Sequence, residues 1–81
     1  MTEAEKDTHR AFAAAGKILG GRDPVADMPG VLITLEHAVA SVLLAVMGRD
    51  ASKAARMLNE GLVPGIERRI MLYAARQRVG E

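Results

Sequence analysis

The sequence VLITLEHAVASVLLAVMG, residues 31–48, is the one long and strongly apolar segment in this chain of 81 residues. On a helix with about 100° between successive residues, its apolar side chains fall into two separate arcs. The first arc contains Val31, Leu32, Leu35, Val39, Val42, Leu43 and Val46, and the second arc contains Ile33, Ala40, Leu44 and Met47. A surface helix has one apolar face, so a helix with two such arcs needs neighbours on most of its sides.

Two kinds of residue separate these arcs. Glu36 lies between them on one side, and a stripe of small or polar residues that includes Thr34, His37 and Ser41 lies between them on the other. A histidine beside a hydroxyl could act as a base–nucleophile pair, but Glu36 points about 100° away from His37 and cannot orient it. We therefore interpret the stripe as structural, with hydroxyls that hydrogen-bond to the preceding turn. The sequence predicts no catalytic residue.

A membrane span is the alternative interpretation of the apolar segment. Residues 31–47 only reach the lower limit of length for crossing the hydrocarbon core. Glu36 and His37 lie near the middle, where ionisable groups are costly in lipid, and Arg22 and Arg49 flank both ends without a positive-inside bias. We predict a buried helix of a cytoplasmic protein with no membrane partner.

The composition excludes several classes of function. There is no cysteine, hence no disulfide framework and no thiolate metal site, and Phe12 and Tyr73 are the only aromatic residues. His9 and His37 lack the spacing of metal ligands, and the N-terminal residues do not resemble a signal peptide. The net charge of +1 argues against strong non-specific binding to phosphates.

The charges are unevenly distributed along the chain. Residues 1–48 carry a net charge of −2, whereas residues 49–81 carry +3. This asymmetry would attract the two halves of the chain, or two subunits, toward each other.

Capping signals predict three further helices. Thr2 and Glu5 form a capping box before a helix over residues 3–19, which Gly20 and Gly21 end. Asp50 is a predicted N-cap for a helix over residues 51–60. Gly61 ends that helix, and Pro64 begins a last one over residues 64–78. We expect one all-α domain over residues 1–81, a small irregular bundle of about four helices around the central helix 31–48. The predicted core is Phe12, Ile18, Leu32, Leu35, Val39, Val42, Val46, Leu58, Ile66, Ile70 and Tyr73.

The connection over residues 20–30 has no ligand-binding motif. Its double glycine lacks the residues of a phosphate-binding loop, and Asp23 and Asp27 lack the further oxygen ligands of a calcium loop. Pro29 disfavours helix at Met28, so we interpret the connection as a linker. No cofactor and no metal are predicted.

The two C-terminal helices suggest a second type of function. Arg68, Arg69, Leu72 and Arg76 share one side of the last helix, and the pair 51–60 and 64–78 has the order of a helix-turn-helix motif. The break between the two helices is long for such a motif, Leu72 interrupts the basic side, and no basic arm flanks it. An arginine-rich surface around an apolar residue also suits an acidic protein partner.

The leading hypothesis is a small non-enzymatic interaction or regulatory protein that presents helical surfaces. We expect a homodimer or higher homo-oligomer, because exposing the second arc would leave an apolar patch that favours association. The predicted interface residues are Ile33, Ala40, Leu44 and Met47. The alternative is a DNA-binding transcriptional regulator that uses the helix-turn-helix-like pair.

Overall fold

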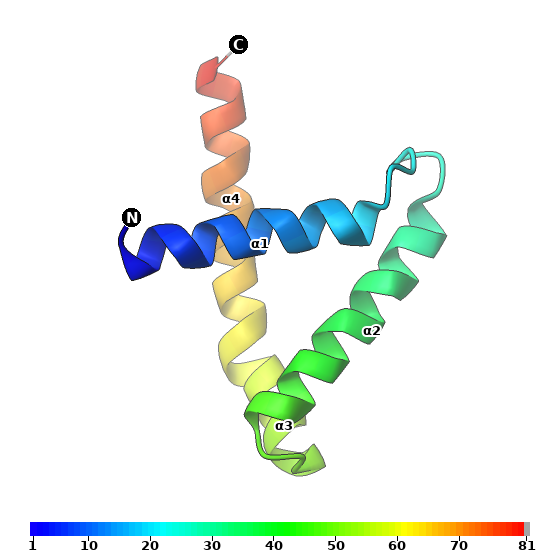
Figure 1. Ribbon diagram of the computed structural model, residues 1–81, viewed down its shortest axis with the longest axis vertical. Coiled ribbons are helices and arrows are strands. Elements are labelled where there is room, and N and C mark those ends of the chain that lie inside the picture. Colours follow the sequence, from blue (N-terminus) through cyan, green and yellow to red (C-terminus); the bar gives the residue numbers. More distant parts are fainter. Residues whose placement is uncertain (81) are drawn as a thin grey trace. The chain divides into compact units, whose positions relative to one another are not determined.

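The chain is all-α, as predicted. A computed structural model describes the backbone of residues 1–80 and the side chains of residues 1–76. It is 82% helical, and no strand occurs in this part of the chain. The elements in order are α1 (Glu3–Leu19), α2 (Met28–Val46), α3 (Ala51–Met57), the π-helical segment η1 (Leu58–Leu62) and α4 (Val63–Gly80), as labelled in Figure 1.

The chain divides into two compact units whose boundary lies inside α2. The first unit, Met1–Val39, contains α1, the first connection and the N-terminal half of α2. The second unit, Ala40–Glu81, contains the C-terminal half of α2 together with α3, η1 and α4. The polar contacts that shape each connection lie within one unit.

Helix α1 has the bounds that its capping signals predict. The hydroxyl of Thr2 accepts a hydrogen bond from the Glu5 N–H at 3.2 Å, and the Glu5 carboxylate accepts one from the Thr2 N–H at 3.3 Å. At the other end Gly20 has a φ of 60°, a conformation that favours glycine, and its N–H donates to the Gly16 carbonyl at 2.9 Å. The capping box and the glycine stop are therefore confirmed.

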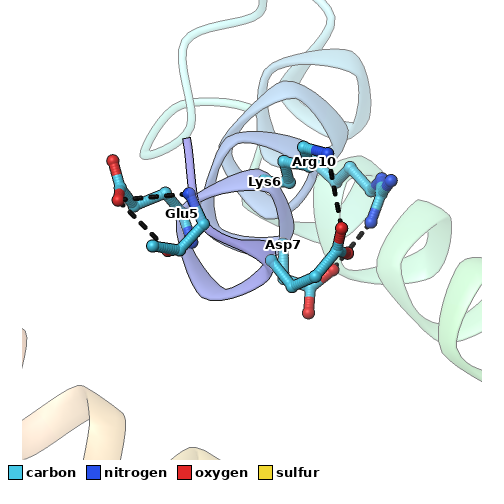
Figure 2. A network of polar contacts seen from close by, with 6 residues as sticks. Glu5, Lys6, Asp7 and Arg10 are labelled. Atoms are coloured by element: carbon cyan, nitrogen blue, oxygen red, sulfur yellow. Dashed lines mark hydrogen bonds and ion pairs between the residues drawn. The ribbon is translucent and has the colours of Figure 1, made fainter.

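The first turns of α1 carry two exposed ion pairs. Lys6 Nζ lies 3.3 Å from Glu3 Oε1, and Arg10 Nη1 lies 2.7 Å from Asp7 Oδ1. Figure 2 shows these pairs beside the capping contacts of Glu5. Exposed pairs three residues apart contribute only about 0.2–0.5 kcal/mol each, so they support the helix without anchoring it.

Helix α2 begins at Met28, three residues before the predicted start. The prediction that Pro29 disfavours helix at Met28 was wrong, because Pro29 lies in the first turn, where its missing N–H has no partner to lose. Backbone bonds from Asp27 N to Asp23 O, at 2.9 Å, and from Val31 N to Asp27 O, at 3.1 Å, lead into this turn. The connection is therefore shorter than the predicted 20–30.

Arg22 joins the end of α1 to the beginning of α2. Its Nε donates to the Leu19 carbonyl at 2.9 Å, and its Nη2 donates to the Ile18 carbonyl. The same Nη2 lies 3.3 Å from Thr34 Oγ1, and Nη1 lies 3.8 Å from Asp27 Oδ2. One planar guanidinium thus caps carbonyls at the negative end of α1. It also contacts Asp27, which precedes α2, and Thr34, which lies in α2.

The connection after α2 turns through two left-handed residues. Gly48 has a φ of 63° and Arg49 a φ of 64°, and the Arg49 N–H donates to the Leu44 carbonyl at 2.8 Å. The Asp50 carboxylate then accepts a hydrogen bond from the Lys53 N–H at 3.0 Å. The predicted N-cap at Asp50 is confirmed, while α2 itself ends at Val46, two residues before the predicted Gly48.

The predicted break between the last two helices does not occur. Helix α3 continues through η1 into α4 without a gap. Gly61 and Pro64 therefore do not end the helix. In η1 the hydrogen bonds lengthen by one residue, as in the bond from the Val63 N–H to the Leu58 carbonyl. Proline cannot donate to the carbonyl four residues earlier and its ring clashes with that carbonyl, and a wider π turn accommodates both effects. Residues 1–80 therefore form three helices rather than four, and they contain no turn of a helix-turn-helix motif.

The predicted core does not form within the chain. Among residues 1–76 Leu43 alone is buried, with 7% of its surface exposed. Ile18 and Val39 are half-buried, and Phe12 is 61% exposed. The other predicted core residues are also exposed, namely Leu32, Leu35, Val42, Val46, Leu58, Ile66, Ile70 and Tyr73. A helix that is apolar on most sides needs more neighbours than this chain supplies.

Arg22 is expected to contribute most of the stability of the first connection. We expect Arg22→Lys to lower the free energy of unfolding by about 1–2 kcal/mol, because an ammonium cannot serve the carbonyls of α1 and Thr34 together. The control is Arg10→Ala, which removes an exposed pair and should change stability by less than about 0.5 kcal/mol. Chemical denaturation followed by circular dichroism measures both. Equal effects of the two substitutions would contradict the role of Arg22.

Candidate interaction sites

A groove forms in the second unit where the chain leaves α2 and enters α3 and η1. It has a volume of about 430 Å³ and is open to solvent. The residues that line it are Met47, Lys53, Arg56, Met57, Glu60 and Gly61. We call this the methionine groove.

The spacing of these residues explains why they meet. Lys53, Arg56, Met57 and Glu60 recur at intervals of three and four residues, so they share one face of the continuous helix. A Cβ at Gly61 would lie 2.6 Å from Met57 Sδ, closer than such atoms approach. Glycine at this position therefore leaves room for the Met57 side chain.

The methionine groove combines an apolar lining with unpaired cations. Met47 and Met57 supply flexible thioether side chains that adapt to the shape of a partner. Lys53 and Arg56 stand at its edge, and neither side chain has an ion pair or hydrogen bond to another described residue. Such a surface suits an apolar side chain that stands next to a carboxylate.

This groove was not predicted from the sequence. Met47 was assigned to the second arc, and Lys53 and Arg56 had no predicted role. The spacing over residues 53–60 was a usable signal, but the helix was predicted to end at Glu60. Gly61 and Met47 join the groove only through the continuation of the helix and the corner at Gly48.

A second depression lies on α4 at the predicted partner surface. Arg68, Arg69 and Leu72 line it together with Gly65, and its volume is about 250 Å³. Arg76, the fourth predicted residue, lies over the ring of Tyr73 with 5.9 Å between its Cζ and the ring centroid. A cation over an aromatic face is attracted by the ring, so Arg76 has a local contact that Arg68 and Arg69 lack among the described residues.

The predicted oligomer interface lies on exposed surface. Ile33 is 54% exposed, Ala40 and Leu44 are also exposed, and Met47 is half-buried and lines the methionine groove. Glu36 and His37, between the arcs, are exposed as well. The role of Ile33, Ala40, Leu44 and Met47 in an oligomer interface stays a prediction.

The remaining polar candidates have local structural partners. Thr34 donates to the Gly30 carbonyl at 3.0 Å, as expected for a hydroxyl that bonds to the preceding turn. Asp23 accepts hydrogen bonds from the N–H groups of Val25 and Ala26, and Asp27 lies beside Arg22. In the described part of the chain no three histidine, aspartate or glutamate side chains gather as metal ligands would. His9 lies beside Ala4, Glu5 and Thr8 in a shallow depression of about 240 Å³ on α1 alone.

By length and composition α2 could cross a membrane, and it is the one such helix in the described residues. Core helices of soluble proteins and signal sequences have the same length and composition. The apolar character of α2 by itself therefore does not distinguish lipid from protein as its surroundings.

Comparisons with protein-family models, with curated proteins and with solved structures find no match for this chain. The site must therefore be interpreted from its own residues.

Two glycine substitutions test the packing at the groove. Gly16→Ala adds a methyl group with no atom within 4 Å, so it should stabilise α1 by about 0.5–1 kcal/mol. Gly61→Ala should gain less or lose stability, because Met57 must move away from the new Cβ. Denaturation measures the difference, and the Met57 methyl resonance should shift in Gly61→Ala only. An unchanged resonance with an equal gain in stability would contradict this packing.

Proposed function

We propose that this chain is a non-enzymatic interaction protein of the cytoplasm that works as a homodimer or higher homo-oligomer. The observation that carries the proposal is the exposure of both apolar arcs of α2 in a chain where Leu43 is the single buried residue among those described. Exposed apolar surface of this kind favours association, since burial gains about 25 cal/mol per Å². The predicted bundle around α2 would then be assembled from helices of more than one subunit.

The second arc suits close contact between helices. Ala40 lies in its middle, where a small side chain lets two helix axes approach, while Ile33 and Leu44 supply larger apolar groups on either side. The first arc, which includes Val42 and Val46, offers a second surface on the same helix. Two such surfaces allow an assembly larger than a dimer.

The depression on α4 suits a further, acidic partner. Leu72 is 48% exposed beside Arg68 and Arg69, so an apolar group could enter between two cations. Arginine is enriched at protein interfaces because its planar group pairs with carboxylates at two points. We propose this surface for partner binding, with the subunits held together separately through α2.

Two charge insertions in α2 should separate the oligomer from the fold. We expect the wild-type chain to be oligomeric at tens of micromolar, and Ile33→Glu/Leu44→Glu to be monomeric, because two carboxylates cannot be buried at the interface without partners. The control is Ser41→Glu, which adds a charge to the small polar stripe of the same helix and should leave the oligomer intact. Size exclusion with light scattering measures the mass of each. A wild-type monomer at this concentration would contradict the proposal.

Binding to DNA would support the alternative function. The arginines of α4 lie on a continuous helix without the turn of a helix-turn-helix motif. We therefore expect that the chain shows no salt-sensitive binding to a mixed-sequence DNA duplex. Fluorescence anisotropy at 50 and 200 mM salt, as two points on the salt axis, measures this. Binding that falls by about tenfold or more over this range, and that Arg68→Glu/Arg69→Glu abolishes, would favour the DNA-binding regulator.

A further inference from the structure

Glu36 is an unpaired carboxylate on an otherwise apolar helix. Around the axis of α2 it lies about 40° from Ala40 and about 60° from Ile33, so it borders the second arc. It is exposed and has no ion pair or hydrogen bond within residues 1–76. An interface that buries the second arc covers Glu36 as well, and a covered carboxylate without a partner is strongly unfavourable.

The methionine groove has the complementary chemistry. Lys53, Arg56 and Glu60 line it without an ion pair to another described residue and together carry a net charge of +1, and Met47 and Met57 offer an apolar surface beside them. Met47 lines this groove and is also the last residue of the predicted second arc. A helix edge that carries an apolar residue and a carboxylate one turn apart fits this surface, and Ile33 with Glu36 is such an edge.

We propose that the methionine groove of each subunit receives the edge formed by Ile33 and Glu36 from a second copy of the chain. In this arrangement the Glu36 carboxylate of one copy pairs with Lys53 and Arg56 of the other copy, and Ile33 packs against Met47 and Met57 of that other copy. The inference rests on the proposed homo-oligomer and specifies which residues form its interface.

The arrangement requires the two copies of α2 to run antiparallel. Glu36 lies in the N-terminal half of α2, whereas Met47 follows its C-terminal end, so mutual contact brings opposite ends together. A two-fold interface has this reciprocity, because each subunit gives and receives the same contact. In this antiparallel arrangement the dipoles of the two α2 helices attract each other.

The cations on α4 are a less suitable partner for Glu36. Arg68 and Arg69 surround Leu72 in a separate depression that shares no residue with the second arc. An interface that buries the second arc therefore need not include Arg68 and Arg69. The methionine groove, by contrast, contains Met47, a residue of the predicted second arc.

A charge exchange between two variants tests this pairing. We expect Glu36→Lys to raise the dimer dissociation constant at least tenfold, and Lys53→Glu/Arg56→Glu to do the same, because each variant places like charges together. An equimolar mixture of the two variants should form heterodimers with an affinity close to that of the wild type, since opposite charges meet in both contacts. Sedimentation equilibrium measures the masses, and Glu67→Lys is the control for a charge change outside the contact.

The outcomes separate this inference from the proposed function. An oligomer that persists in Glu36→Lys, or a mixture that fails to form heterodimers, overturns the pairing and leaves the homo-oligomer standing. A wild-type monomer overturns both proposals. Partitioning of the wild-type chain onto phosphatidylcholine vesicles without self-association also overturns both, and would identify lipid as the cover for α2.

Discussion

The structure depends above all on the apolar surface of α2, which extends around most of the helix. Two arcs of branched and aliphatic side chains leave only Glu36 and a narrow polar stripe between them. The chain buries Leu43 and leaves the larger side chains of both arcs in contact with solvent among its described residues. Because removing apolar surface from water is the main driving force of folding, we expect a further surface to cover α2.

Polar contacts, rather than a core, set the geometry of the connections. Arg22 binds carbonyls of α1 and the hydroxyl of Thr34, and Asp50 caps α3. At Pro64 the wider turn of η1 keeps the helix continuous where a regular α-helix would clash. These local contacts hold single helices and turns in place and leave the apolar side chains of α2, such as Ile33 and Val42, exposed.

The proposed interface gives one explanation for several features that have no explanation within a single copy of the chain. When two copies meet antiparallel, a role would fall to Glu36, to Lys53 and Arg56, and to the groove that Met47 and Met57 line. None of these three charged side chains has an ion pair among the described residues. Paired charges inside an apolar interface add little net affinity over apolar contacts, but they penalise wrong arrangements. They would thus determine the register of the two subunits and leave Arg68 and Arg69 available for another partner.

The all-α class, the bounds of α1 and the N-cap at Asp50 were predictable from sequence, because capping depends on residues within one turn of the helix end. The gathering of Arg68, Arg69 and Leu72 on one side of α4 was also predictable, because helical spacing alone places them together. Two features became clear only from the three-dimensional structure. Gly61 and Pro64 act as breakers in isolation, yet the wider turn before Pro64 lets the helix continue. The methionine groove joins Met47 to residues 53–61 across the corner at Gly48, and no local pattern encodes that proximity.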